Sequence, residues 1–281
     1  MKPNIILMNF THVYEQERFI NDIHFQWIDC TDLNGTNCYC DAEAAKVIRQ
    51  RMAPYLPEGI HFIDSGNYHY ISKFWTDKIK TPFSLVVFDH HPDMQPSLFD
   101  NLMSCGCWVK KVLDTNPYLQ KVCIVGAAEK LIKALHPNYG EKLKFYSETE
   151  LSHEEGWNRF SHEHLNEPVY ISVDKDVLDI KSAVTNWDQG SLSLTELEKL
   201  LSIILKKEEI IDVDNSERTE KEELFEDFEF LNENCGTVNS KNSFGGYAGS
   251  KRFVSVNDMV DLEGHSVSKK EMDILWRKHC S

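Results

Sequence analysis

The stretch Phe83-Ser84-Leu85-Val86-Val87-Phe88-Asp89-His90-His91-Pro92-Asp93 decides the fold of this chain. It opens with a short run of apolar, β-branched and aromatic residues, which is typical of a strand buried in a parallel sheet. Polar side chains follow directly. In open α/β sheets, ligands bind in the crevice at the carboxyl ends of the strands. The stretch therefore predicts a buried strand that ends at a ligand site.

Two further stretches contribute polar side chains of the same kinds. The apolar run Val169-Tyr170-Ile171-Ser172-Val173 leads into Asp174-Lys175-Asp176, and Gly66-Asn67-Tyr68-His69 lies upstream of both runs. Residues at alternate positions of an extended segment point to the same side. The two aspartates of Asp174-Lys175-Asp176 therefore share a side, and so do the aspartates and His91 of the first stretch.

Four aspartates and at least one histidine are thus expected in one small volume at the carboxyl edge of the sheet. So many carboxylates cannot share a site away from water unless a strong positive charge lies among them. Aspartate oxygens together with imidazole nitrogens suit manganese or zinc better than calcium. Two such ions about 3.5–4 Å apart can hold one hydroxide as a nucleophile at neutral pH. The sequence predicts a divalent metal cluster that attacks an electrophilic carbon or phosphorus.

Strand and helix signals alternate along the chain, which indicates an α/β fold. Strands are expected at 5–10, 25–29, 60–64, 84–89, 121–125, 143–146, 169–174 and 210–213. Helices are expected at 41–51, 69–79, 107–114, 127–135, 153–164 and 193–206. Asp41 is an N-cap signal, and Ser193 with Glu196 forms a capping box. We predict a three-layer α/β/α sandwich around a mainly parallel sheet of about eight strands.

The 281 residues, 41% of them hydrophobic, are enough for one sizeable core. No linker divides residues 1–235, so we expect one domain spanning 1–281. An acidic amphipathic helix is expected around 217–230, a Gly-, Asn- and Ser-rich loop at 236–249 and a last helix at 268–278. The role of residues 236–281 stays open.

The net charge of −15 argues against a protein that follows nucleic-acid phosphates, which would need a basic stripe. A cationic small molecule or peptide suits this charge better. The apolar run at the N-terminus is too short for a signal peptide or a membrane span. The 8 cysteines form no disulfide framework or zinc-knuckle spacing, so reduced thiols and a cytoplasmic location are expected.

The order of the three motifs resembles that of the arginase/agmatinase (ureohydrolase) superfamily: Gly-x-x-His comes first, then Asp-x-His-x-Asp, then Asp-x-Asp. The resemblance extends from about Gly66 to about Glu217 and implies a divergent member with the arginase–deacetylase fold. It implies two Mn²⁺ per chain, with zinc, iron or cobalt as alternatives, and hydroxide attack on a guanidinium carbon to give urea and an amine. One ion would be held by His69, Asp89, Asp93 and Asp174, and the other by Asp89, His91, Asp174 and Asp176.

The departures from the family pattern concern the substrate side. Cys105 stands where the family has its proton-shuttle histidine, so Cys105 and Asp93 are the candidate catalytic residues. Asp212 is expected in place of a glutamate that clamps the guanidinium, and Gln95 replaces an arginase-like asparagine. Trp187 lies on the loop after the Asp-x-Asp strand, either as a turn residue or as a wall of the pocket. The expected substrate is a small guanidino compound or an arginine-containing peptide.

Three other functions are compatible with parts of the pattern. A phosphoesterase of the DHH type shares Asp89-His90-His91, but its Asp-x-Asp motif precedes that signature, whereas here it follows. A single-zinc deacetylase or amidohydrolase on the same fold would need only Asp-x-His and a later aspartate. A non-catalytic metal-binding member would explain the missing shuttle histidine. No oligomer interface can be identified in the sequence, although homo-oligomers are common in the family.

Overall fold

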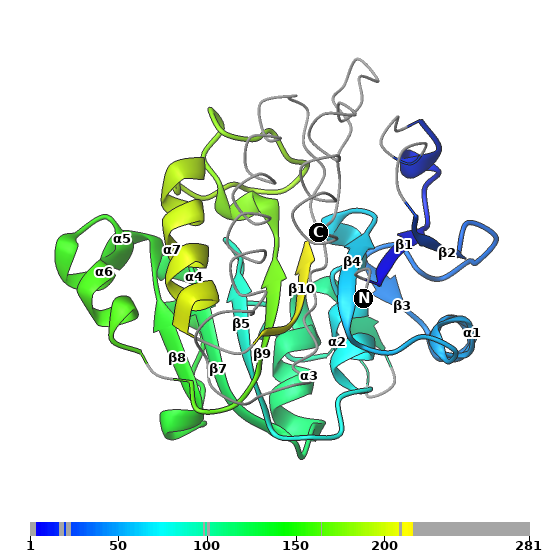
Figure 1. Cartoon of the computed structure of the whole chain (residues 1–281), viewed down its shortest axis with the longest axis horizontal. Coiled ribbons are helices and arrows are strands. Elements are labelled where there is room, and N and C mark those ends of the chain that lie inside the picture. The colour runs from blue at the N-terminus through cyan, green and yellow to red at the C-terminus, as the bar shows by residue number, and fades with distance from the viewer. Residues whose placement is uncertain are drawn as a thin grey trace, which may run out of the picture.

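The structure is a computed structural model that describes residues 4–16, 20, 24–97, 99, 102–163, 165–207 and 210–215, with the backbone alone at 207 and 210–215. Its centre is an eight-stranded sheet with the order β2-β1-β4-β10-β9-β5-β7-β8 (Figure 1). All neighbouring strands of this sheet run parallel. The strands are β1 (Ile5–Asn9), β2 (Gln26–Asp29), β4 (Gly59–Ile63), β5 (Phe83–Phe88), β7 (Leu119–Val125), β8 (Leu143–Tyr146), β9 (Val169–Val173) and β10 (Ile210–Asn215).

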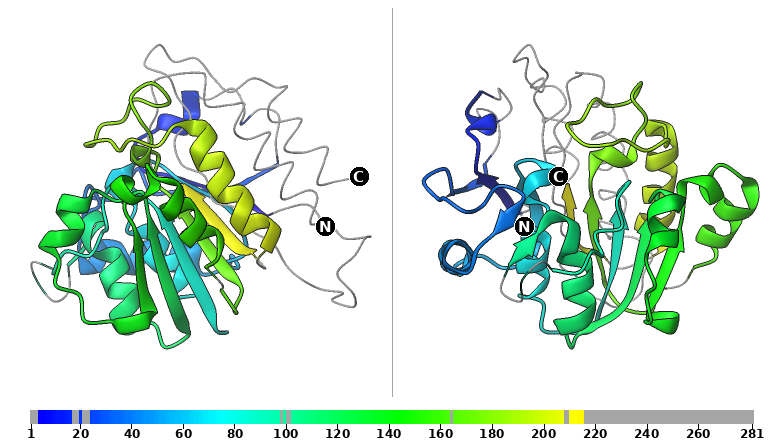
Figure 2. Two further views of the ribbon diagram at one scale, coloured as in Figure 1. Left: turned by 90° about the vertical axis from the view of Figure 1, so that its left-hand side faces the viewer. Right: turned by 180° about the vertical axis from the view of Figure 1, so that it is seen from behind.

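Helices cover both faces of the sheet. Side chains of α5, α6 and α7 pack in a core cluster with one face, which includes Leu7, Val86 and Ile171. Side chains of α1, α2, α3 and α4 pack in a second cluster with the other face. In the left view of Figure 2, α7 and α3 lie on opposite sides of the sheet. The helices are α1 (Ala42–Met52), α2 (Ile71–Thr76), α3 (Trp108–Thr115), α4 (Glu129–Ala134), α5 (Glu148–Leu151), α6 (Glu154–Ser161) and α7 (Leu194–Lys207).

The two-sided covering explains the composition of the strands. A strand buried on both faces needs apolar residues throughout, and every described side chain of β1, β4, β5 and β9 is buried. Neighbouring residues such as Leu85 and Val86 contribute to opposite core clusters. The predicted three-layer α/β/α sandwich is confirmed, with each of the eight expected strands present in the sheet.

Local signals at helix starts are also confirmed. The Asp41 side chain accepts from the backbone N–H of Ala44 at 2.9 Å and caps α1. At α7, the Glu196 carboxylate accepts from the Ser193 backbone N–H at 2.8 Å, and the Ser193 hydroxyl accepts from the Glu196 N–H at 3.4 Å. Such reciprocal bonds satisfy two backbone N–H groups at the start of the helix that have no partner within it.

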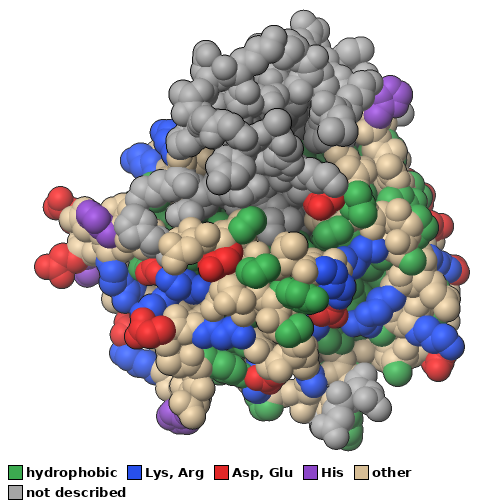
Figure 3. All heavy atoms as spheres, turned by 60° about the horizontal axis from the view of Figure 1, so that its bottom comes forward, with side chains coloured by type: hydrophobic (Ala, Val, Ile, Leu, Met, Phe, Trp, Pro, Cys, Tyr) green, Lys and Arg blue, Asp and Glu red, His purple; other side chains and the backbone are tan. Residues whose placement is uncertain are grey.

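The sequence prediction missed a short antiparallel ribbon, β3 (Tyr39–Cys40) with β6 (Met103–Ser104), and the one-turn helix α5. Each is too short to show a period of hydrophobic residues. The face shown in Figure 3 carries acidic and basic side chains interspersed with hydrophobic ones. None of the helices within the described residues is long and apolar enough to cross a bilayer. The elements expected after residue 215 lie outside the described residues, and a single domain over 1–281 stays a prediction.

Candidate metal centre

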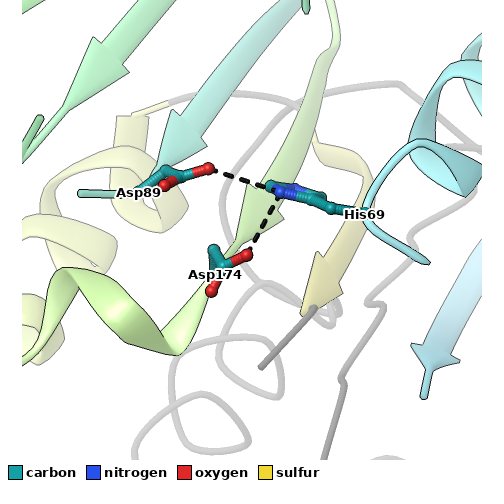
Figure 4. Close-up of side chains that lie close together, drawn as sticks. All are labelled: His69, Asp89 and Asp174. Carbon is teal, nitrogen blue, oxygen red and sulfur yellow. Dashed lines mark ion pairs between the residues drawn. The ribbon is translucent and has the colours of Figure 1, made fainter. Parts of the chain in front are cut away.

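The three sequence stretches meet at the carboxyl edge of the sheet. His69 follows β4 and a single 3-10 turn, η3 (Gly66–Tyr68), whereas Asp89 comes directly after β5 and Asp174 directly after β9. β5 and β9 are neighbours, and β10 lies between β9 and β4. Figure 4 shows the carboxylates of Asp89 and Asp174 pointing toward the His69 ring from these different elements.

His69 is the centre of the first cluster of ligand atoms. Its Nδ1 lies 3.3 Å from Asp89 Oδ2, 3.2 Å from Asp174 Oδ2 and 3.1 Å from Asp93 Oδ2. Each of these side chains is at most 7% exposed. One ring N–H can bond to only one of three carboxylates, so this convergence is better suited to a cation than to a proton.

The far side of the His69 ring fixes its orientation. Nε2 lies 2.8 Å from the hydroxyl of Ser172, which belongs to β9. If Nε2 carries the hydrogen and donates to Ser172, the lone pair of Nδ1 faces the carboxylates. Metal-binding histidines are commonly oriented in this way by a partner of the other ring nitrogen.

A second cluster surrounds His91. Its Nδ1 lies 2.7 Å from Asp176 Oδ2 and 3.6 Å from Asp89 Oδ1. His69, Asp89 and Asp174 therefore form one group with metal-ligand spacing, and Asp89, His91 and Asp176 form another. Asp89 belongs to both groups, one carboxylate oxygen facing each histidine. The Asp174 carboxylate, which the resemblance made a second bridge, belongs to the first group only.

Backbone N–H groups hold the carboxylates in place. The His91 N–H donates to Asp89 Oδ1 at 2.5 Å, and the His90 N–H donates to Asp176 Oδ1 at 2.9 Å. The Asp176 N–H donates to Asp174 Oδ1 at 3.1 Å, at the start of a 3-10 turn, η6 (Lys175–Val177). The centre is therefore rigid because the two loops that carry the ligands also bond to them.

Asp93 has an unusual backbone and an unexpected partner. Its φ is +49°, in the left-handed region that non-glycine residues rarely adopt. Strained residues of this kind concentrate at functional sites. The buried indole N–H of Trp108 donates to Asp93 Oδ2 at 2.6 Å. Asp93 contacts His69 as expected, but it lies outside both three-residue groups.

The charges of the centre are unbalanced without a cation. Burial, and then the negative charge of Asp89, raise the pKa of Asp93 to about 7. Burial also raises the pKa of Asp176 well above its usual range, and Asp174 and Asp89 add to this effect. For His91, burial lowers the pKa, but bonds to Asp176 and Asp89 outweigh it and raise the pKa to about 12. Without a metal ion, these three side chains therefore hold protons that offset the negative charge of the buried carboxylates. Divalent cations would supply this positive charge instead.

The residues expected on the substrate side of the centre differ in how closely they approach it. Trp187 stands at the centre, with its ring 5.8 Å from the His91 ring and its N–H 3.1 Å from Asn67 Oδ1. Cys105 is half-buried, and its thiol is close enough to Asp93 and His69 for their charges to influence its pKa, which burial raises strongly. Gln95 has an exposed side chain, and its backbone N–H donates to Gly106 at 2.9 Å.

The expectation for Asp212 is wrong. The register of β10 pairs Asp212 with Gly59 and Tyr170, near the starts of the neighbouring strands. β10 continues past the predicted end at Val213 to Asn215, which lies level with Val173 at the carboxyl edge. Asp212 is therefore three residues short of that edge, about 10 Å at the rise of a strand. It cannot clamp a substrate at the metal centre.

Two residues of the centre were not assigned a role from the sequence. Ser172 could have been found, because it lies two positions before Asp174 on a strand and shares its side. Trp108 gives no such signal, since its partner Asp93 is on another element. The six described cysteines are all free.

Sequence comparisons relate this chain to known proteins over most of its length. The arginase family model matches residues 4–219. An uncharacterised protein of Thermotoga maritima is 32% identical over 201 residues, which cover 71% of this chain and 73% of that protein.

Solved structures match at the level of the fold. The agmatine ureohydrolase of Thermoplasma volcanium has a TM-score of 0.55 and 17% identity, over 77% of this chain and 82% of its own. The formimidoylglutamase from Bacillus subtilis has a TM-score of 0.55 and 15% identity, over 78% of this chain and 80% of its own. Their names give different substrates, so the likeness alone selects none.

Proposed function

The chain belongs to the arginase family, and on this premise we propose that it is a binuclear-metal hydrolase. The proposed reaction cleaves a guanidino C–N bond of an arginine-like substrate, free or peptide-borne, to urea and an amine. Water adds to the guanidinium carbon, the bond to the substituted nitrogen breaks, and this nitrogen leaves with a proton. The observation that carries the proposal is the pair of ligand groups joined through Asp89.

The donor set supports two Mn²⁺ per chain. Each group offers one imidazole nitrogen and carboxylate oxygens, a mixture that suits manganese and also admits zinc, iron or cobalt. When bound, two divalent cations would acidify a shared water and stabilise the charge that develops on the substrate. His69, Asp89 and Asp174 would hold one ion, and Asp89, His91 and Asp176 the other. Asp93, whose Oδ2 lies 3.1 Å from His69 Nδ1, would be a further ligand of the first ion.

Asp93 is the candidate for moving the proton from the attacking water to the departing amine. Its carboxylate Oδ2 lies 3.1 Å from His69 Nδ1, in the cluster that would hold the first ion, and a carboxylate can accept a proton and return it. The Trp108 N–H fixes the orientation of its carboxylate. Cys105 keeps its proton at neutral pH because burial raises the pKa of the thiol. It therefore remains a neutral thiol near Asp93.

Trp187 is the candidate for binding the substrate cation. Its side chain is 37% exposed at the open side of the centre, next to His91. A guanidinium group over an indole face gains about 0.5–2 kcal/mol, depending on how far it is removed from water. This placement supports a cationic substrate, free or at the end of an exposed arginine side chain.

Metal content and product identity together test the proposal. Full-length protein is loaded with Mn²⁺, freed of excess metal and analysed for ions per chain. The loaded protein is then assayed for urea with agmatine, arginine, other guanidino acids and arginine-containing peptides. Asp89→Asn should lose both ions and all urea release, because its two oxygens serve both groups. Asp32→Asn, an exposed carboxylate remote from the centre, is the matched control.

We expect about two ions per chain and urea from at least one of these substrates. One zinc per chain together with acetate release from acetylated amines would instead establish the deacetylase alternative. Two bound ions without turnover of any amidino compound would make the chain a non-catalytic metal-binding member.

A further inference from the structure

A groove that is separate from the metal centre lies among the helices on one face of the sheet. It has a volume of about 680 Å³ between α1, α2 and α3, with the β3–β6 ribbon contributing to its wall. This volume is in the range of sites for small molecules, roughly 300–1,000 Å³. None of the metal-centre residues lines it. The lining comprises Cys40, Ala42, Ala45, Lys46, Arg49, Gln50, Ala53, Lys73, Phe74, Leu102, Met103, Lys111 and Thr115.

One face of α1 forms a side of the groove. Lys46, Arg49, Gln50 and Ala53 recur at helical spacing, and these positions share a side of a helix. The small side chains of Ala42, Ala45 and Ala53 leave room between the longer polar ones.

The charge of the groove is opposite to that of the chain. Its lining includes four cationic side chains, Lys46, Arg49, Lys73 and Lys111, and the described lining residues include no Asp or Glu. The whole chain carries a net charge of −15. On the face drawn in Figure 3, basic side chains are interspersed with acidic ones. A concave surface lined by one sign of charge concentrates counter-ions of the other sign.

The inner part of the groove is built rather than a loose set of surface lysines. The Arg49 guanidinium lies over the Phe74 ring at 3.7 Å from its centroid, and Phe74 is only 2% exposed. Arg49 Nη2 is 3.4 Å from Asp77 Oδ2, and Lys73 bonds to the other oxygen of the same carboxylate. Two cations therefore share the single charge of Asp77.

Lys73 is the more deeply placed of these cations, with 5% of its surface exposed. Burial lowers its pKa, and the pairing with Asp77 does not fully offset that effect. The positive charge of Arg49 acts in the same direction. A second anion at this end of the groove would relieve the repulsion between the two cations.

We propose that this groove binds a small molecule that carries a phosphate group on an apolar body. Arg49 and Lys73 share one carboxylate and Lys46 adds a further positive charge, so a phosphate dianion matches this part of the groove better than a carboxylate, which has a single charge. Arginine offers it a planar fork of donors, and lysines add point charges. Leu102 and Met103, which are partly exposed, provide apolar contacts for the rest of the ligand.

Phenyl phosphate is the probe, because it combines a phosphate group with an apolar ring. Inorganic phosphate is the matched ligand that lacks the apolar part. Binding to the full-length, metal-loaded protein is measured by titration calorimetry in a phosphate-free buffer. Lys46→Glu/Lys111→Glu reverses two charges of the lining while leaving buried Lys73 in place. Lys133→Glu/Lys199→Glu makes the same change of net charge at lysines of α4 and α7 outside the groove.

We expect phenyl phosphate to bind more tightly than inorganic phosphate. The groove variant should weaken phenyl phosphate binding about tenfold or more, a change of ~1.4 kcal/mol, whereas the control variant should leave it unchanged. Arg49→Lys, which keeps the charge but loses the fork, should give an intermediate loss. Because the readout is binding, the outcome is independent of whether the chain releases urea.

Three results would overturn the proposal. The first is no heat of binding from phenyl phosphate at millimolar concentration. The second is equal weakening in the groove variant and its control, which would indicate unspecific attraction. The third is tight binding of a synthetic peptide with the acidic sequence of residues 217–230 when phenyl phosphate does not bind, which would assign the groove to an acidic segment of protein.

Discussion

The two halves of the candidate metal centre differ in their access to water. The His69 group is closed, with 1% of the His69 side chain exposed and three carboxylates around one nitrogen. The His91 group is open, with 25% of the His91 side chain exposed and Trp187 as its neighbour. The same residue types therefore serve two purposes. The closed half holds charge in a fixed place, and the open half is where a substrate can approach.

This comparison predicts unequal effects of removing the two histidines. In the metal-free protein, burial lowers the pKa of His69, but hydrogen bonds to the surrounding carboxylates outweigh it and raise the pKa well above its usual value. His69→Ala therefore leaves three buried carboxylates without their cationic partner, a loss of about 3–5 kcal/mol for the metal-free protein. His91→Ala should cost clearly less, because water reaches its partners. Denaturant unfolding of both variants and ion counts after Mn²⁺ loading check the difference. Equal losses would contradict the division into a closed and an open half.

Metal removal should make the stability depend on pH. In the metal-free protein the pKa of Asp93 is raised from 3.8 to about 7, and that of His91 from 6.5 to about 12. The native state thus binds more protons than the unfolded state between these values, so the free energy of unfolding falls as pH rises from 5 to 8. The lowered pKa of Asp89 acts only below pH 4 and lies outside this window. Burial, and then the charge of His91, lower the pKa of His90, so this group opposes the trend in the acidic part of the window.

Mn²⁺ should reverse this trend, because it replaces the protons. At a hundred times the dissociation constant, each ion adds about 2.7 kcal/mol. Melting curves at pH 5 and 8, with chelator and with Mn²⁺, measure both effects. A metal-free protein that becomes more stable toward pH 8 would show that these groups do not lack positive charge.

Trp108→Phe tests the support of the closed half. The ring is kept and the N–H that donates to Asp93 is lost. Loss of such an outer partner weakens metal binding about 10–100-fold, and we expect the lower end of that range. Competition with a fluorescent chelator reports the affinity. Trp157→Phe, which removes an indole N–H bonded to the Leu151 carbonyl, is the control.

Trp187→Ala should give the smallest effect on the protein itself. The side chain is partly exposed, so the stability should change by less than about 1 kcal/mol and two ions should remain bound. If Trp187 contacts the substrate cation, KM should rise several-fold with little change in kcat. A loss of metal in this variant would move Trp187 from the substrate to the centre itself.

The candidate ligands could be predicted from the sequence because each stands shortly after an apolar run or in a short motif. The four candidate ligands Asp89, His91, Asp174 and Asp176 do converge, but not through alternation along an extended chain. Asp176 lies in the 3-10 turn η6, and it belongs to a different ligand group from Asp174. The prediction for Asp212 failed, because the end of a strand cannot be located to one residue within a continuous run of apolar and acidic residues. Register decided that position, and register depends on the neighbouring strands.

Contacts between distant elements were beyond the sequence. The Trp108–Asp93 bond and the β3–β6 ribbon depend on where the chain returns in space. The phosphate groove is a further case, because its cations come from three helices separated by 65 positions of sequence from Lys46 to Lys111.

The strand order has a consequence for how the protein is made. β2, β1 and β4 form one part of the sheet, and β5, β7 and β8 form another. β9 and β10, the last strands of the described chain to be synthesised, lie between these two parts and join them. His69 follows a strand of the first part, and Asp89 follows a strand of the second. The candidate ligands of a nascent chain are therefore divided between two separate halves, which meet only when β9 and β10 have joined the sheet.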